Sequence, residues 1–326
     1  MLLEEVAIVC IAKNEEKYIN EWIYYHIKLG VSKIIIYDNS DNYSLGYLNI
    51  SWAGKVWVIH YPGSGQKANI KRKTQPNFEG TQINAYENYM TTWRQKNLMY
   101  KWVAFIDCDE FIKLTFDDNI VKFMKRINFH EGVLTMNWVH FGSNGHEKYI
   151  NRPILERFNK REKNIHIPFH KCVCVITDII YWEYPGHKVI TNKFYRDAHG
   201  KHIPQDSFTK EPAINDIYLG HIMCKSKEEF EIKMKRGNNH LTKGSEGRDF
   251  GGRGWNHFNE FDKNDIEDNS LRDFLFSQKQ VVNGLEVDNY LWKYHDLFEN
   301  GIMNPERLFE HWINIGKKEG RITNLS

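Results

Sequence analysis

The stretch "WVAFIDCDEFI", residues 102–112, decides the fold, because an apolar run there ends abruptly in acidic residues. The run 102–106 predicts a buried strand, and Asp107, Asp109 and Glu110 follow it at once. Two carboxylates one residue apart at a strand end repel each other, and a cation between them relieves the repulsion. We therefore predict that Asp107 and Asp109 bind a divalent ion. Mn²⁺ or Mg²⁺ is expected, since such ions take oxygen ligands and usually bind substrate phosphates as well.

Similar apolar runs precede this stretch in the sequence. Apolar runs predict further buried strands at 6–11, 33–37 and 56–59. Helical spacing predicts a helix between the first two, capped by Asn14 and ended by Gly30, and a second helix over residues 82–100. Strands separated by helices are typical of βαβ units, so we expect an α/β fold with a mostly parallel sheet.

Polar clusters follow three of these strands. They are "AKNE", "DNSD" and "DCDE", at 12–15, 38–41 and 107–110. Ligands of parallel sheets bind at the carboxyl ends of the strands. The sequence therefore predicts a binding site where the three clusters meet.

The second half of the chain is less regular. We expect a helix at 116–127, a strand at 132–138 and a strand pair within 170–190. The charged segment 225–237 predicts a helix with a solvated face. Residues 237–269, rich in Gly, Asn and Asp, predict a mobile loop or lid. Leu, Phe and Trp spacing predicts a helical C-terminal extension over 271–326, after a main domain at 1–270.

The composition and the motifs that are missing limit the classes of function that we expect for this chain. A net charge of +2 over 326 residues gives no support to nucleic-acid binding. The five cysteines form no CxxC pair, which favours a reducing compartment. We expect no signal peptide in the first residues, and the sequence shows no spanning apolar segment, no P-loop, no GxSxG and no GxGxxG. We expect a cytoplasmic protein with at most peripheral contact with a membrane.

Several polar residues leave two interpretations open. Asp38 can accept hydrogen bonds from a ribose or base, or it can form a turn in its own loop. Asn14 is fully explained by helix capping. His221 follows an apolar run and can bind a metal or pack in the core. Arg157 and Arg161 can clamp a phosphate or solvate a helix face.

The ordered series of motifs resembles glycosyltransferase family 92, a family-2-like group of GT-A glycosyltransferases. The segments that carry the resemblance are "CIAKNEEKYINEWIYYHIKLGVSKIIIYDNSDN", "WVAFIDCDEFI", "WVHFGSNGH", "ILERFNKR", "HIMCKSKEEFEIKMKRG" and "FNEFDKNDIEDNSL". Together they cover about residues 5–270. Ile222 departs from the pattern, because the family often has Tyr there.

The resemblance implies a GT-A fold, Rossmann-like with a mostly parallel sheet flanked by helices, and sugar transfer from a nucleotide-diphosphate sugar. It also implies roles for individual residues. Asp107 and Asp109 become the metal-binding DxD pair, with His221 as a further metal or diphosphate contact. The implied nucleotide-sugar contacts are Ala12, Asn14, Asp38, Gln82 and Asp107.

The implied chemistry is metal-assisted departure of the diphosphate, and the family suggests inversion of the sugar. An inverting enzyme needs a carboxylate to take the acceptor proton. We predict Glu156 in this role, with Asp206 as the alternative and an ion pair with a neighbouring arginine as the structural explanation of Glu156.

The expected partners are a UDP-sugar, with UDP-galactose as the first donor to test by analogy, and a glycan, polysaccharide or lipid-linked glycan acceptor. Two other functions compete with this one. A sugar nucleotidylyltransferase also uses acidic metal ligands on an α/β sheet, although it normally has a glycine-rich basic loop where this chain has "AKNEE". A carbohydrate-binding protein without catalysis is the second alternative. The tail at 304–321 resembles a short helical motif attached to polysaccharide-building transferases, and we expect it to pack or dock.

Overall fold

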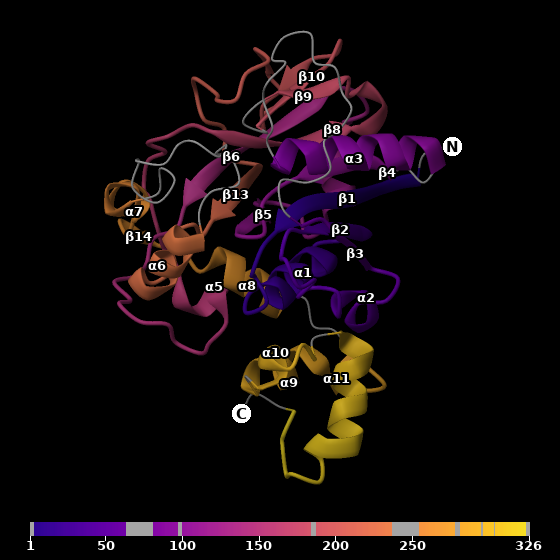
Figure 1. Cartoon of the computed structure of the whole chain (residues 1–326), viewed down its shortest axis with the longest axis vertical. Helices are drawn as coiled ribbons and strands as arrows, with labels where there is room; N and C mark the ends of the chain where they lie inside the picture. Colours follow the sequence, from indigo (N-terminus) through magenta and orange to yellow (C-terminus); the bar gives the residue numbers. More distant parts are fainter. Residues whose placement is uncertain are drawn as a thin grey trace.

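The structure is a computed structural model of the chain, and it has a central, mostly parallel sheet flanked by helices (Figure 1). This α/β architecture confirms the predicted fold class. The residues that the structure describes are 3–62, 81–96, 100–183, 187–236, 254–277, 281–294, 296–302 and 304–323.

The central sheet has ten strands in the order β12-β11-β6-β8-β4-β1-β2-β3, with β13 paired to β6 and β5 paired to β13. Parallel pairing joins β1 to β2 and β4, β2 to β3, and β6 to β11 and β13. β8 runs antiparallel between β4 and β6. The strands are β1 (Leu3–Ala12), β2 (Lys33–Asp38), β3 (Val56–His60), β4 (Tyr100–Phe105), β5 (Glu110–Leu114), β6 (Val133–His140), β8 (His170–Val175), β11 (Tyr195–Arg196), β12 (His202–Ile203) and β13 (Ile217–His221).

Short strand pairs lie outside this sheet. They are β9 (Tyr181–Glu183) with β10 (Lys188–Ile190), β7 (Lys160–Arg161) with β14 (Ile266–Glu267), and β15 (Val281–Val282) with β16 (Leu285–Glu286). The helices are α1 (Ile19–Lys28), α2 (Leu48–Ser51), α3 (Thr81–Lys96), α4 (Ile120–Arg126), α5 (Ile154–Arg157), α6 (Lys227–Arg236), α7 (Trp255–Phe261), α8 (Ser270–Ser277), α9 (Val287–Lys293), α10 (Asp296–Glu299) and α11 (Pro305–His311).

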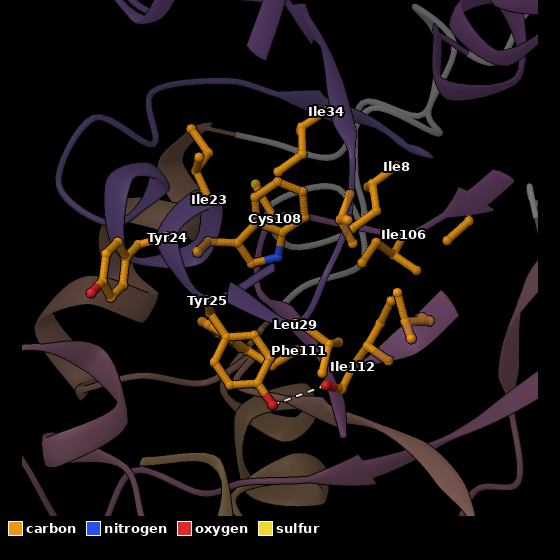
Figure 2. Packing of buried hydrophobic residues seen from close by; sticks show 14 of the residues in the cluster. Ile8, Ile23, Tyr24, Tyr25, Leu29, Ile34, Ile106, Cys108, Phe111 and Ile112 are labelled. Atoms are coloured by element: carbon orange, nitrogen blue, oxygen red, sulfur yellow. Dashed lines mark hydrogen bonds between the residues drawn. The ribbon is translucent and has the colours of Figure 1, made fainter. Parts of the chain in front are cut away.

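The sheet is covered on both faces because its strands are apolar on both sides. In β1, Val6 and Ile8 belong to the core cluster that contains α1, while Ala7 and Val9 belong to the cluster that contains α3. Such continuous burial is typical of a parallel sheet between two helical layers. Figure 2 shows the α1 side, where the hydroxyl of Tyr25 donates a hydrogen bond of 2.9 Å to the carbonyl of Ile112.

The helix after β1 begins later than predicted. α1 starts at Ile19, and Asn14 does not cap it. The backbone of Asn14 has a φ of +55°, a left-handed conformation that asparagine tolerates better than most residues. Its backbone amide donates a hydrogen bond to Oγ of Ser40, 3.3 Å away. Residues 13–18 therefore form a connecting turn at the strand end, and Gly30, with a φ of +95°, lies just beyond the helix as expected.

The predicted lid at 237–269 is partly wrong. Residues 237–253 lie outside the described residues, but 254–269 contain α7 and β14. Phe258 and Phe261 of α7 are buried against Phe230 of α6. The apolar side chains of this stretch supply a small core that the Gly and Asn content concealed.

The C-terminal extension packs beneath α1 and α2 (Figure 1). Buried residues of α9, including Tyr290 and Leu291, belong to the same core cluster as α1. The ammonium of Lys28 also lies 3.0 Å from a carboxylate oxygen of Asp288. Among the described residues, no helix has the length and apolar character needed to cross a bilayer.

Candidate functional site

The three polar clusters meet at one edge of the sheet. β4, β1 and β2 are neighbours, and the register pairs Ala12 with Asp38 and Val9 with Phe105. The carboxyl ends of these parallel strands therefore lie side by side, followed by Asn14, Asn39 and Asp107. This confirms the predicted meeting of the clusters.

Asp107 lies just after β4 and is held by two side chains. Gln82, at the start of α3, donates its amide to Oδ1 of Asp107 at 2.6 Å. The Nζ atom of Lys171, a buried residue of β8, lies 3.0 Å from Oδ2. Burial favours a raised pKa for Asp107, but the ammonium of Lys171 outweighs it and leaves the pKa below its usual value. The Asp107 side chain is 31% exposed, so it remains accessible.

Asp109 lies in the turn between β4 and β5 and faces two cationic or polar groups. Nζ of Lys233, from α6, is 2.7 Å from its Oδ2, and Nε2 of His221 is 3.5 Å from its Oδ1. Burial again favours a raised pKa, yet Lys233 and then His221 hold the pKa of Asp109 well below its usual value. Asp109 is therefore a carboxylate at neutral pH.

Strand register explains why His221 reaches Asp109. β13 lies between β5 and β6, and His221, its last residue, pairs with Glu110 on one side and His140 on the other. The His221 side chain is buried, and its Nδ1 atom has no hydrogen-bond partner among the described residues. The sequence thus placed His221 correctly at a strand end, and the fold brings it to the acidic turn.

Glu110 supports the turn instead of facing the site. One carboxylate oxygen accepts the amide of Asp107 at 2.8 Å, and the other accepts Nε1 of Trp138 at 2.8 Å. Its side chain is fully buried, and this burial raises the pKa of Glu110 well above its usual value. The third acid of "DCDE" therefore holds the backbone of Asp107 in place.

The distance between Asp109 and His221 is compatible with two ligands of one cation, and metal binding by this pair stays a prediction. Their facing atoms are 3.5 Å apart, which is long for a hydrogen bond. Two ligands that bind one Mg²⁺ ion at about 2.1 Å each lie about 3 Å apart when their bonds are at right angles. The carboxylate oxygen suits Mn²⁺ and Mg²⁺. Asp107 sits beside this pair but is engaged by Gln82 and Lys171, so its share in metal binding stays a prediction.

Asn14 and Asp38, two of the predicted nucleotide contacts, differ in solvent exposure. Asn14 is exposed at the end of β1. Asp38 is fully buried, and its two oxygens accept the amides of Ser40 and Leu45, each at 2.9 Å. In the described structure Asp38 shapes its own loop, which is the turn-forming interpretation, and its predicted contact with a nucleotide remains untested. Ala12 is buried, and its carbonyl accepts the amide of Asn39 at 2.8 Å.

A cavity of about 380 Å³ opens between the turn after β1 and helix α6. Its lining includes Asn14, Tyr18, Tyr149, Lys225 and Lys233. Aromatic rings and polar side chains around one hollow are typical of ligand sites. Lys233 links this cavity to Asp109, although Asp107, Asp109 and His221 are not among its lining residues.

The predicted base is not among the residues that line this cavity. Glu156 lies on α5 and is partly exposed. The carboxylate of Glu21 anchors α5 by accepting the amides of Ile154 at 2.6 Å and Leu155 at 3.0 Å. Asp206 accepts the amide of Ser207 at 2.7 Å. Neither candidate base is joined by a described contact to Asp107 or Asp109.

The two arginines do not form the suggested pair on one helix. α5 ends at Arg157, and Arg161 lies in β7. Arg157 binds both oxygens of Glu229, at 2.9 and 3.1 Å, and Arg161 lies 2.6 Å from Asp268. Both guanidinium groups therefore hold the fold together in this structure.

A cluster of His140, Glu162 and His166 lies near His221, and its first two members are buried while His166 is exposed. Nδ1 of His140 and Nδ1 of His166 are 2.9 and 2.6 Å from the two oxygens of Glu162. Both backbone amides of these histidines also donate to Glu162, at 2.8 and 3.1 Å. The rings of His140 and His221 are 5.6 Å apart between centroids. These hydrogen bonds hold the ring of His140 in place beside the ring of His221.

Sequence reasoning missed Lys171 and Lys233. The charged helix 225–237 was expected to have a solvated face, but Glu229 is buried and Lys233 is only 10% exposed. Lys171 interrupts a fully buried strand, and a cation in such a run was the available signal. Lys233 carried no comparable signal, because a cation on a charged helix looks the same whether it faces water or a carboxylate.

Comparisons with known proteins add the family. A sequence model described as Glycosyltransferase family 92 matches residues 6–250. No curated protein matches the chain. Among solved structures, HddC from Yersinia pseudotuberculosis is similar with a TM-score of 0.28 and 12% identity over 52% of this chain and 73% of HddC. S. aureus TarS is similar with a TM-score of 0.34 and 13% identity over 94% of this chain, which spans 55% of TarS.

Proposed function

The chain belongs to glycosyltransferase family 92, and we propose that it transfers a sugar from a nucleotide-diphosphate sugar to a glycan or polysaccharide acceptor with inversion. A UDP-sugar is the proposed donor, and UDP-galactose is the first to test. The observation that carries the proposal is the approach of His221 to Asp109, 3.5 Å apart beside an accessible Asp107. Family membership favours this function over nucleotidylyl transfer and over carbohydrate binding without catalysis.

The proposed metal is Mn²⁺ or Mg²⁺, and Asp109 and His221 would hold it, with Asp107 as the further carboxylate. When bound, the ion supplies a Lewis acid that neutralises the departing diphosphate. Protein sites for such ions usually offer few protein ligands and leave the remaining positions to water and substrate phosphates. A site with two or three side chains at a strand edge fits that pattern.

The chain's own residues fix the orientation of these ligands. Gln82 and Lys171 each hold one oxygen of Asp107, so its carboxylate plane is set before any ligand arrives. Glu110 fixes the backbone of Asp107 by accepting its amide. Such fixed geometry lowers the cost of ordering the site on binding.

The nucleotide is proposed to lie along the turn after β1. Ala12 and Asn14 border this turn, and Asp38 shapes the neighbouring loop through the amides of Ser40 and Leu45. Asn14 also lines the cavity. Its backbone is left-handed, with a φ of +55°.

The proposed base remains Glu156, with Asp206 as the alternative. Glu156 is partly exposed on an anchored helix, so it is available to an acceptor that reaches over α5. In this role its carboxylate would take the proton of the acceptor hydroxyl as the oxygen attacks the sugar.

A panel of nucleotide sugars tests the proposed function. The purified protein would be incubated with each donor, with Mn²⁺ or with EDTA, and release of the nucleoside diphosphate would be measured. We expect the nucleoside diphosphate to be released from one UDP-sugar, and only when Mn²⁺ is present. Equal release in EDTA would contradict the metal, and formation of UTP and a sugar 1-phosphate from the UDP-sugar and added pyrophosphate would favour nucleotidylyl transfer.

A further inference from the structure

His140, Glu162 and His166 bring three metal-binding side chains together near the end of β6. Nδ1 of His140 lies 2.9 Å from one carboxylate oxygen of Glu162, and Nδ1 of His166 lies 2.6 Å from the other. The ligand atoms of the three side chains all lie within 4.8 Å of one another. Two imidazoles and one carboxylate form a ligand set that zinc sites in proteins use.

The backbone fixes the carboxylate of Glu162 in this group. The amides of His140 and His166 donate to its two oxygens, at 2.8 and 3.1 Å. Each oxygen therefore accepts one backbone hydrogen bond and faces one histidine ring. Carboxylates that bind metal ions are held by hydrogen bonds of this kind, so the orientation of Glu162 is set before an ion arrives.

Glu162 carries a negative charge inside the protein. Its side chain is 1% exposed, and burial favours a raised pKa, but its hydrogen bonds, first of all that of His140, lower the pKa of Glu162 to about 2. In the described part of the chain, no lysine or arginine nitrogen lies within 4.0 Å of this carboxylate. A buried carboxylate is costly unless a cation compensates its charge, so the site favours a bound cation.

The ring of His140 is ready to bind a metal. Burial, as the largest cause, lowers the pKa of His140 to about 4, so the ring is neutral at pH 7. Its Nδ1 atom faces a carboxylate and therefore carries the ring proton in the metal-free protein. When Nδ1 binds a metal, this proton moves to Nε2, which has no hydrogen-bond partner among the described residues and is free to take it.

His166 opens the group to solvent. Its side chain is 27% exposed, whereas those of His140 and Glu162 are 1% exposed, so an ion can enter beside the His166 ring. Two ligands of a tetrahedral zinc ion, bound at about 2.0–2.1 Å, lie about 3.4 Å apart. The separations of 2.9 and 2.6 Å are close to this value, so small rotations of the two rings would complete the site. Three protein ligands leave the fourth position to water.

We propose that His140, Glu162 and His166 bind one Zn²⁺ ion, which ties the end of β6 to the segment after β7. This site goes beyond the proposed function, because it shares no ligand with the ion proposed at Asp109 and His221. His140 pairs with His221 in the register of β6 and β13. The zinc ion would therefore brace the strand end beside the donor site without taking part in the transfer.

Cobalt spectroscopy tests the site. Co²⁺ replaces Zn²⁺ in tetrahedral sites and gives visible absorption bands there that octahedral Co²⁺ shows only weakly. We expect these bands in the wild type and in Asp109→Asn, saturating at one Co²⁺ per chain and removed by added Zn²⁺. His166→Gln should lack the bands, while the control His199→Gln, at an exposed histidine, should keep them.

Calorimetry with Zn²⁺ measures the size of the effect. Asp109→Asn serves as the parent protein, so that the acidic turn does not contribute to the titration. Adding His166→Gln to this parent should raise the Kd for Zn²⁺ by at least about 100-fold, because the loss of a residue that merely orients a metal ligand already costs 10–100-fold. Adding His199→Gln should leave the Kd within about twofold of the parent.

X-ray absorption keeps the test decisive if His166→Gln does not fold, which circular dichroism would reveal. Zinc-loaded Asp109→Asn should show two histidine ligands at about 2.0–2.1 Å. A zinc ion bound at His221 would show one histidine, so a spectrum with one histidine or none would contradict the site.

The proposal and the proposed function fail separately. Absence of tetrahedral bands in the wild type leaves a cluster held by hydrogen bonds alone and overturns the zinc site. Bands that persist in His166→Gln, or that vanish in Asp109→Asn, overturn it as well, because they assign the ion to other residues. None of these results affects the Mn²⁺-dependent release of a nucleoside diphosphate, which tests the proposed function.

Discussion

Lys233 and Asp109 are 124 positions apart in the chain, yet their charged groups lie 2.7 Å from each other. The contact joins α6 to the turn after β4. A segment with the composition of a surface helix is therefore part of the acidic site. The buried contacts of α6 lead to the first prediction.

Loss of the buried ion pair between Arg157 and Glu229 should destabilise the fold strongly. Both side chains are 3% exposed, so Arg157→Met leaves an uncompensated carboxylate in the interior. We expect the free energy of unfolding to fall by about 3–5 kcal/mol in urea titrations. Lys235→Met, which breaks an exposed pair, should change it by less than about 1 kcal/mol. Equal effects in the two variants would contradict the assignment.

Stability should fall in mild acid because of His140. Burial, ahead of all other causes, lowers the pKa of His140 from 6.5 to about 4, although Glu162 opposes this shift. The folded state therefore binds fewer protons than the unfolded chain between these pH values. Stability is fully present above the unfolded pKa and is lost as the pH falls toward 4, by about 1.4 kcal/mol for each pH unit.

The contribution of His140 to the pH dependence of the free energy of unfolding can be measured by substitution. In His140→Gln the free energy of unfolding should depend less steeply on pH between about 6.5 and 4 than in the wild type. His199→Gln, at an exposed position, is the control and should keep the wild-type slope. Since His166 and His221 lie near His140, the comparison must use the slopes and not the absolute stabilities. An unchanged slope in His140→Gln would rule out this source of acid sensitivity.

Gln82→Leu should weaken donor binding without unfolding the protein. The variant removes the amide that holds Oδ1 of Asp107 at 2.6 Å, while Lys171 still holds Oδ2. We expect the Kd for UDP with Mn²⁺ to rise about tenfold, as for the loss of a charge-assisted hydrogen bond. Gln205→Leu, which removes a bond to the Thr191 carbonyl, should leave this Kd unchanged. Wild-type affinity in Gln82→Leu would show that Asp107 needs no such support.

Glu156→Gln should lower kcat by about 100-fold or more with little change in UDP affinity, if Glu156 takes the acceptor proton. Asp206→Asn is the comparison variant, and under this assignment it should retain most of its turnover. Full activity in Glu156→Gln with loss of activity in Asp206→Asn would transfer the role to Asp206. Both measurements need the acceptor, so they follow the donor panel.

The sequence predicted the parts of the site that depend on local pattern. Apolar runs located the strands, and the polar residues after them located the edge where Asp107 and Asp109 lie. His221 was expected at a strand end and is there. These features follow from short-range periodicity and from the general rule for parallel sheets.

The parts that failed depend on long-range pairing. The start of α1 was placed too early, since the left-handed backbone of Asn14 and its contact with Ser40 are tertiary features. The buried face of α6 was missed because Arg157 and Asp109, its partners, come from distant segments. The role of Glu110 was not predicted, because its oxygens accept from Trp138, which is distant in the sequence, and from the amide of Asp107.

The most direct test of the account is calorimetric binding of UDP to the wild type and to Asp109→Asn, each with Mn²⁺ and with EDTA. We expect the wild type to bind UDP about 100-fold more tightly with Mn²⁺, and Asp109→Asn to lose that difference. Asp118→Asn, an exposed carboxylate 3.2 Å from Lys122, should behave as the wild type does. If Asp109→Asn binds UDP with the same Mn²⁺ dependence as the wild type, Asp109 is not a metal ligand and the proposed donor site is wrong.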